Sequence, residues 1–138
     1  MNQKFTLSHR DAMIIVARIQ AELEKDRRGA AVAVADDHGE LIALLRTDGC
    51  PLASINNAIN KAFTAARERR ESKAVGQSSQ EKGWPMTNFG DLRYTAWGGG
   101  VPIFHEGQVV GGVGVSGLPE EDDMVLARLG AKVLSEQK

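Results

Sequence analysis

Residues 98–117 read GGGVPIFHEGQVVGGVGVSG, two apolar runs on either side of a Glu106-Gly107 turn. The runs at 101–105 and 108–115 predict two β-strands, and a two-residue turn that ends in glycine is typical of a β-hairpin. A hairpin joins antiparallel neighbours, so this stretch predicts an antiparallel sheet. The glycines inside the second run predict that this strand passes close to another segment of backbone.

Three other segments have the apolar spacing of amphipathic helices: residues 8–26, 52–70 and about 119–135. Ser8, followed by Asp11 three residues later, predicts a capping box at the start of the first helix. The second helix carries mostly Ala and Ser beside its apolar line, which allows close approach of another helix. We therefore expect the chain to form a homo-oligomer, a dimer or larger.

Two further strands are expected at residues 30–35 and 41–45, around the turn Asp36–Gly39. The second of these is a nearly continuous apolar run, which predicts burial on both faces. Residues 74–93 predict a long ordered loop with room for one short helix, and residues 94–97 predict a fifth, short strand. The order α-β-β-α-loop-β-β-β-α then predicts one α+β domain over residues 1–138, with a central five-stranded antiparallel sheet flanked by helices.

The composition excludes several classes of protein. A net charge of −1 argues against a nucleic-acid-binding protein with a basic face. No apolar run approaches the roughly 18 residues of a membrane span, and the first residues lack the apolar stretch of a signal peptide. A single cysteine fits a reducing compartment. We expect a cytoplasmic protein with no membrane and no nucleic-acid partner.

The glycine run Gly98, Gly99 and Gly100 is the first candidate for a ligand site. Three consecutive glycines cost backbone entropy on folding, so such a run is typical of a place where a ligand or another backbone comes close. Asn88, Phe89 and Trp97 lie in the same stretch. Together these residues predict a pocket with one flat apolar wall and backbone donors.

Residues 112–117 match the pattern G-x-G-x-x-G, but they do not predict a dinucleotide site. That fingerprint needs a second strand and an acidic residue about 20 residues further on, and here only one helix follows. The acidic residues at 120–123 would also repel an anion at the start of that helix.

The titratable candidates leave several interpretations open. Arg46, Asp48 and Lys61 form either an anion-binding group or ordinary surface charge, and Asp48, Lys61 or His105 would supply a catalytic proton. No two histidines have the spacing of a metal site, so no metal centre is predicted. His9 or His105 would act as a metal ligand only as the single axial ligand of a haem.

Several motifs of this sequence, taken in order, resemble the GlcG/HbpS family, which includes the C-terminal domain of PduO-type proteins. The first half contains VADDHGEL at 34–41, RTDG at 46–49 and KAFTAA at 61–66. The second half contains GGGVPI at 98–103 and GQVVGGVGVSG at 107–117. The resemblance covers nearly the whole chain.

The resemblance implies a profilin-like α+β fold, homo-oligomers and, in several members, haem binding. Haem-binding PduO-type members carry an axial histidine in the middle of the first helix, where this chain has Ile15, Val16 and Ala17. Three functions follow as hypotheses. The chain binds haem or a similar flat organic ligand, or it is a metal-independent enzyme acting on a small organic acid or catabolic intermediate, or it is an accessory protein of a catabolic operon.

Overall fold

The computed structural model describes residues 1–137. Within these residues the chain forms one sheet of four strands, four α-helices and one short 3₁₀-helix. In chain order the elements are α1 (His9–Lys25), β1 (Ala31–Asp36), β2 (Leu41–Arg46), α2 (Leu52–Glu68), α3 (Ser72–Lys82), η1 (Met86–Phe89), β3 (Gly100–His105), β4 (Gln108–Ser116) and α4 (Glu120–Glu136).

The strands lie in the order β2-β1-β4-β3, and every neighbouring pair is antiparallel. The predicted α+β class and the hairpin of β3 and β4 are confirmed. The fifth strand is wrong, because residues 94–97 pair with no strand of the described chain. Two of their backbone donors bond side chains instead: the Thr95 N–H donates to the Thr64 hydroxyl, and the Trp97 N–H donates to the Thr95 hydroxyl.

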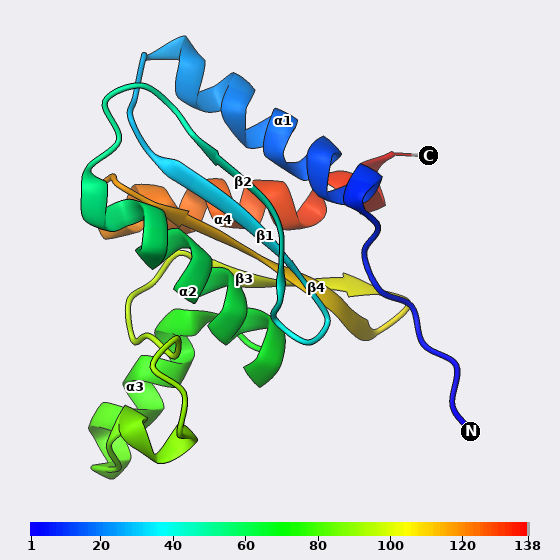
Figure 1. Cartoon of the computed structure of the whole chain (residues 1–138), viewed down its shortest axis with the longest axis vertical. Coiled ribbons are helices and arrows are strands. Elements are labelled where there is room, and N and C mark those ends of the chain that lie inside the picture. The colour runs from blue at the N-terminus through cyan, green and yellow to red at the C-terminus, as the bar shows by residue number, and fades with distance from the viewer. Residues whose placement is uncertain (138) are drawn as a thin grey trace.

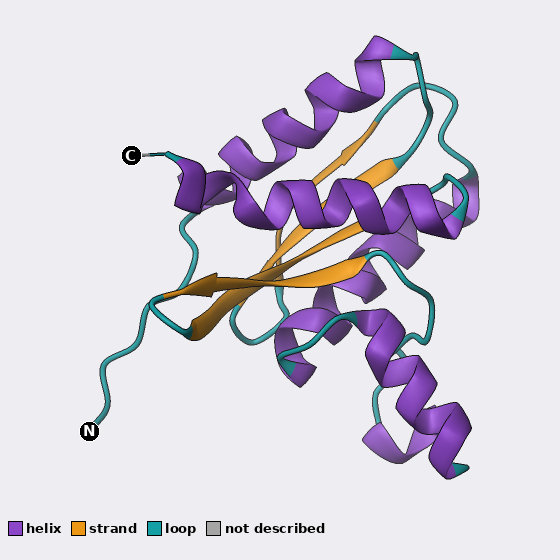
Figure 2. Ribbon diagram, turned by 180° about the vertical axis from the view of Figure 1, so that it is seen from behind, coloured by secondary structure: helices purple, strands orange, loops and turns teal. Residues whose placement is uncertain are grey.

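Helices cover both faces of the sheet (Figures 1 and 2). The two faces differ in side-chain size because β1 alternates Val with Ala and β4 alternates Val with Gly. The valines point into the core beneath α1 and α4. The small residues face α2, so this helix lies close against the backbone of the sheet.

Two glycines of β4 set the position of α2. A Cβ at Gly112 would lie 2.5 Å from the Ala62 carbonyl oxygen, and one at Gly114 would lie 2.1 Å from that of Ala58. The expected close approach of another backbone is therefore confirmed, and that backbone is α2 of the same chain. The Ala-rich side of α2 is consequently buried against its own sheet and gives no support for self-association.

The predicted ordered segment over residues 74–93 contains more helix than expected. Most of its first half is α3, which ends at Lys82 and is capped by Gly83, and η1 follows. Only Ser72, Val75 and Gly76 of α3 are buried. Because a Cβ at Gly76 would lie 2.5 Å from the Ala96 carbonyl oxygen, the contact depends on small residues and leaves weak apolar periodicity. Figure 2 shows α3 extending away from the sheet.

The strand β2 was expected to be buried on both faces, and this is wrong. It lies at the edge of the sheet, and each of its residues is exposed or half-buried. Its apolar run reflects partial packing against the core through Ile42, Ala43 and Leu45. The capping box of α1 is confirmed, with Ser8 and Asp11 each accepting from the other's backbone N–H. No helix within residues 1–137 has both the length and the apolar character that a bilayer span requires.

Candidate functional site

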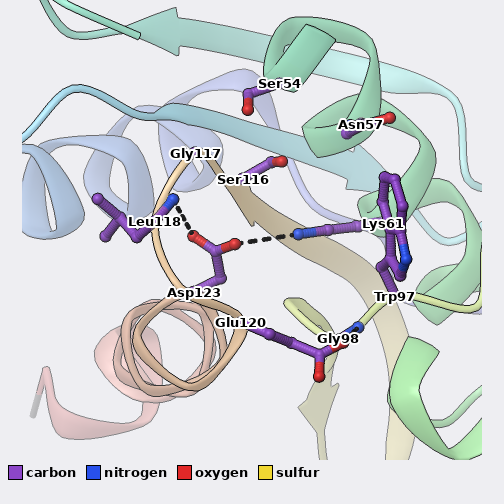
Figure 3. Close-up of a pocket in the computed structure, with 10 residues that line it drawn as sticks. All are labelled: Ser54, Asn57, Lys61, Trp97, Gly98, Ser116, Gly117, Leu118, Glu120 and Asp123. Atoms are coloured by element: carbon purple, nitrogen blue, oxygen red, sulfur yellow. Dashed lines mark hydrogen bonds and ion pairs between the residues drawn. The ribbon is translucent and has the colours of Figure 1, made fainter. Parts of the chain in front are cut away.

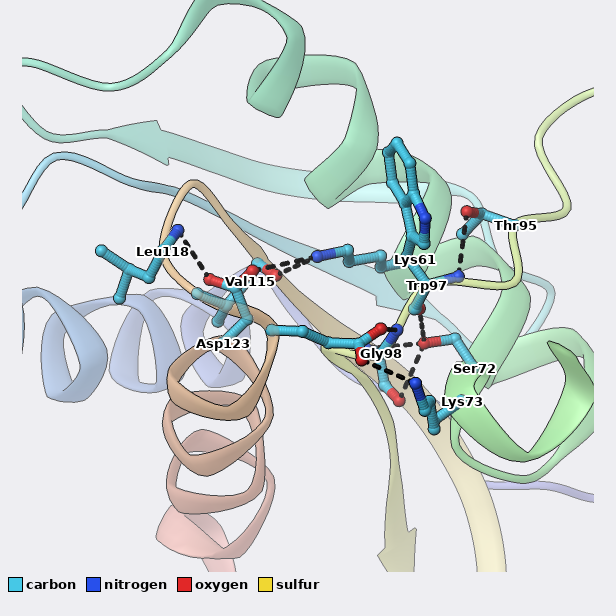
Figure 4. Close-up of polar contacts among 11 residues, drawn as sticks. Lys61, Ser72, Lys73, Thr95, Trp97, Gly98, Val115, Leu118 and Asp123 are labelled. Atoms are coloured by element: carbon cyan, nitrogen blue, oxygen red, sulfur yellow. Dashed lines mark hydrogen bonds and ion pairs between the residues drawn. The ribbon is translucent and has the colours of Figure 1, made fainter. Parts of the chain in front are cut away.

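A buried ion pair joins the middle of α2 to the first turn of α4. The Lys61 ammonium donates to the Val115 carbonyl oxygen at 3.0 Å and to Asp123 Oδ2 at 3.2 Å. Both side chains of the pair are only 4% exposed. Figures 3 and 4 show the two side chains pointing toward one another beside the end of β4. A charged pair is kept away from water only where such partners compensate it.

Two residues of the glycine run leave room for Lys61. Gly99 has φ +122°, and a Cβ there would lie 3.0 Å from Lys61 Nζ and 2.5 Å from the Val115 carbonyl oxygen. A Cβ at Gly100 would lie 2.2 Å from the Lys61 carbonyl oxygen. These two glycines therefore make room for α2 of the same chain, whereas Gly98 lines a pocket.

Ser72, the first residue of α3, fixes this glycine run. Its hydroxyl accepts from the Gly100 N–H at 2.9 Å and donates to the Trp97 carbonyl oxygen at 2.7 Å (Figure 4). Ser72 is itself buried. The helix α3 thus holds the backbone on which Trp97 and Gly98 are carried.

The acidic residues at the start of α4 use the nearby backbone donors. Asp123 Oδ1 accepts from the Leu118 N–H at 3.1 Å, and Glu120 accepts from the Gly98 N–H at 2.8 Å. Glu120 also pairs with Lys73 at 2.6 Å. Because these donors are already occupied, the helix start offers neither of them to an anionic ligand.

The two carboxylates have opposite electrostatic surroundings. Burial raises the pKa of Asp123 above its ordinary value, although Lys61 acts against this rise. The hydrogen bonds from Lys73 and from the Gly98 backbone lower the pKa of Glu120. Asp123 is therefore the stronger base of the two.

Lys61 and Asp123 form part of the wall of a pocket of about 480 Å³ (Figure 3). Trp97, which is 59% exposed, forms a flat apolar wall. Three further polar side chains line it: Ser54, Asn57 and Ser116. The remaining lining residues are Gly98, Gly117, Leu118 and Glu120.

The structure brings some of the predicted site residues together and separates others. Lys61, Trp97 and Gly98 share the pocket. Asn88 and Phe89 belong to η1, and the Phe89 ring stacks on Tyr94 with centroids 4.0 Å apart. Neither residue lines the pocket of Trp97, so the expected wall of Phe89 and Trp97 is not formed.

Arg46 and Asp48 line a separate depression at the C-terminal end of α1. His105 lies at the end of β3, where its half-exposed ring meets Phe5 edge-on with centroids 4.8 Å apart. His9 is exposed in the first turn of α1. In the part of the chain that the structure describes, no group of three or more His, Cys, Asp or Glu side chains is arranged to hold a metal ion.

Asp123 is the site residue that the sequence did not single out. It lies within the acidic run 120–123, which is typical of a solvated helix start. Helical periodicity could have identified it, because Asp123, Ala127 and Gly130 fall on one buried face of α4. A charged residue in phase with a buried face needs a partner of opposite charge, and Lys61 supplies it.

The model of the family described as haem degrading protein HbpS-like matches residues 7–132. Protein GlcG of Escherichia coli strain K12 is 38% identical over 122 residues, covering 84% of this chain and 85% of GlcG. A double mutant of Streptomyces reticuli HbpS has a TM-score of 0.86 at 30% identity, covering 97% of this chain and 90% of that one.

The crystal structure of Klebsiella pneumoniae protein ORFY has a TM-score of 0.92 at 24% identity, covering all of this chain and 97% of that one. This likeness shows the fold. The identity to GlcG and the match to the family model also show the family, because both extend over most of the described elements. The chain belongs to the family described as haem degrading protein HbpS-like.

Proposed function

We propose that the chain binds a small, flat organic molecule with a carbonyl or carboxylate oxygen, in the pocket of Lys61 and Trp97. A 2-oxo acid with an aromatic ring has both features. The observation that carries the proposal is the Lys61 ammonium group. It has three N–H donors, and the contacts to Val115 and Asp123 use two of them.

Lys61 lines the pocket and is otherwise enclosed by the protein, so we assign its third donor to the ligand. The hydroxyls of Ser54 and Ser116 and the amide of Asn57 add donors and acceptors on the same wall. Each of these groups lines the pocket and can bond an oxygen-bearing ligand. A hydrogen bond to a charged group contributes about 1.5–3 kcal/mol, so the contact from Lys61 would supply most of the polar affinity.

Trp97 supports the second part of the proposal. More than half of its side chain is exposed, although it lies at the rim of a polar pocket. An exposed indole offers a large apolar face, which a flat ring covers at little cost in conformational entropy. Ligand sites of this kind combine an apolar wall with a few directed polar groups.

A haem is implied by the family, but the residues present do not fit one. In the middle of α1, Ile15 and Val16 are core residues that cannot bind iron. The described residues that line the Lys61 pocket include no His, Cys or Met. His105 lines a smaller pocket of about 330 Å³ whose charged member is Asp11, so that pocket offers no cation to the haem propionates.

Isothermal titration with benzoylformate, a flat aromatic 2-oxo acid, tests the proposal. We expect saturable binding at one site per chain, lost in Lys61→Met and retained in Lys82→Met, an exposed lysine at the end of α3. If Lys61→Met does not fold, Ser54→Ala with Asn57→Ala replaces it and should weaken binding about tenfold. Equal affinity in these pocket variants and the wild type contradicts the proposal.

We also propose that the chain self-associates, as the family resemblance implies. Exposed Leu41 and Leu44 on the edge strand β2 support this, because an unpaired apolar edge is a typical contact between subunits. Light scattering coupled to size exclusion should give a mass that is a multiple of 14.9 kDa. A monomeric mass at high micromolar concentration contradicts self-association and leaves the ligand site unaffected.

A further inference from the structure

We propose that Lys61 and Asp123 together move a proton at the carbon next to a bound carbonyl group, so that the protein interconverts keto and enol forms. This inference rests on the proposed ligand site and adds a reaction to it. Neither the family description nor the names of the relatives state such an activity.

The argument begins with the arrangement of an acid and a base in one pocket. Lys61 Nζ and Asp123 Oδ2 are 3.2 Å apart, and both residues line the space in which the ligand is expected. A ligand oxygen that accepts from Lys61 is therefore held within a few ångströms of the carboxylate. A general base must lie within reach of the proton that it removes before its pKa becomes relevant, and this proximity meets that condition.

The carboxylate keeps a lone pair for the reaction. Asp123 Oδ1 accepts from the Leu118 N–H, Oδ2 accepts from Lys61, and the Gly117 backbone also bonds the carboxylate. The two carboxylate oxygens have about four acceptor positions together, so these three contacts leave one for the reaction. The contact with the Leu118 N–H fixes the direction of the carboxylate. The third N–H of Lys61 remains free to bond the ligand oxygen.

The step balances without an oxidant or a reductant. Asp123 takes a proton from the α-carbon, the C–H electron pair forms a C=C bond, and the carbonyl π electrons move to oxygen. The hydrogen bond from Lys61 stabilises the negative charge that develops on this oxygen. Return of the proton from Asp123, to oxygen or to carbon, completes the interconversion and restores the carboxylate.

The surroundings suit a base of this kind. Burial raises the pKa of Asp123, and a carboxylate with a raised pKa binds a proton more readily. The adjacent Lys61 ammonium group favours the ionised carboxylate, which keeps it available as a base. Glu120, the other carboxylate that lines the pocket, is less available as a base, because it already accepts hydrogen bonds from Lys73 and from the Gly98 N–H.

Phenylpyruvate in D₂O provides the test, because its methylene protons exchange only through the enol. We expect the wild-type protein to accelerate loss of the methylene signal in proton NMR spectra above the rate in buffer. Asp123→Asn should reduce this acceleration by about 100-fold or more, the usual contribution of a general base. Asp122→Asn, an exposed neighbour on the same helix, should not change it.

Binding of benzoylformate, which has no α-hydrogen, is measured on the same samples. It should persist in Asp123→Asn, so that a loss of exchange is separated from a loss of the site. If Asp123→Asn does not fold, Asp123→Glu retains the charge and displaces the carboxylate by one methylene, and should show the same loss.

Exchange at the buffer rate in the wild type overturns the inference, as does equal acceleration in the wild type and the Asp123 variants. If benzoylformate binds in that case, the proposed ligand site stands and only the reaction is withdrawn. If it does not bind, both fail together for this class of ligand.

Discussion

The Lys61 ammonium group lies 3.2 Å from Asp123 Oδ2, although 62 residues separate the two along the chain. This contact joins α2, which lies on one face of the sheet, to the start of α4, which lies on the other. It passes the end of β4, where Lys61 also bonds the Val115 carbonyl oxygen. One buried lysine therefore connects three elements and reaches the candidate ligand pocket.

Removing one member of this pair should be more harmful than removing both. Lys61→Met should lower the free energy of unfolding by about 3–5 kcal/mol, since it leaves the Asp123 carboxylate buried without a counter-charge. The double variant Lys61→Met with Asp123→Asn should recover part of this loss. Urea denaturation measures the wild type, both single variants and the double variant. A double variant that is less stable than Lys61→Met by the full cost of Asp123→Asn would show that the two residues are not coupled.

The glycines of β4 should tolerate no side chain. Gly114→Ala places a Cβ 2.1 Å from the Ala58 carbonyl oxygen, so α2 must move away from the sheet. We expect a loss of about 3 kcal/mol or more in urea denaturation. Gly83→Ala is the control, since its Cβ meets open space and the variant pays only for a positive φ, about 1–2 kcal/mol. A smaller loss for Gly114→Ala than for Gly83→Ala would contradict this packing.

The contact between Glu120 and Lys73 should depend on pH. The pKa of Glu120 is lowered below 4.5 in the folded protein, so its stabilising contribution is complete above that value. The contribution is lost as the pH falls through the lower, folded pKa. Thermal unfolding of the wild type and of Glu120→Gln, followed from about pH 7 to about pH 3, should show a difference in stability that shrinks on acidification. A difference that grows toward low pH contradicts this assignment.

Trp97 should contribute to ligand affinity and contribute little to the stability of the fold. Because its side chain is 59% exposed, Trp97→Ala should change stability by no more than about 1 kcal/mol. The same variant should weaken benzoylformate binding at least tenfold, while Leu92→Ala, at an exposed residue outside the pocket, leaves it unchanged. Trp84→Phe makes Trp97 the sole tryptophan, and its fluorescence should then respond to the ligand. A silent Trp97 signal at saturating ligand contradicts its place in the site.

Hemin should not bind this protein at a specific site, because the chain has no axial ligand in the middle of α1. We expect a titration followed by Soret absorbance to give no saturable one-to-one band, because the helix positions that would carry iron are core residues. His105→Ala should give the same trace as the wild type. A saturable band in the wild type that disappears in His105→Ala would show that this half-exposed histidine has taken over the role.

Most of the fold could be predicted from local patterns. The Val and Ala alternation of β1, the Glu106-Gly107 turn and the Ser8 capping box each act through neighbours in sequence, and each is found in the structure. The errors concern segments whose partners are distant. Residues 94–97 form no strand because the hydroxyls of Thr64, from α2, and of Thr95 take up two backbone donors of this stretch. The helix α3 lacks a broad apolar face because it packs through Gly76.

The candidate site was predicted only in part for the same reason. Trp97 and Gly98 are adjacent in sequence and share the pocket, whereas Gly99 and Gly100 make room for α2. Lys61 does not lie with Arg46 and Asp48, which line a separate depression. Phe89 was grouped with Trp97 by sequence proximity, whereas Tyr94 stacks on it. Asp123 was hidden in an acidic run, and only the tertiary contact with Lys61 distinguishes it from its neighbours.

The most direct test of the ligand site is a map of backbone amide shifts in the ¹⁵N-labelled wild-type protein during titration with benzoylformate. The account predicts that the largest changes fall on the amides of Gly98, Ser116, Gly117 and Leu118, which surround the Lys61 pocket. Changes that gather instead around His105 and Phe104, or around Arg46 and Asp48, would place the ligand in another depression and contradict the account.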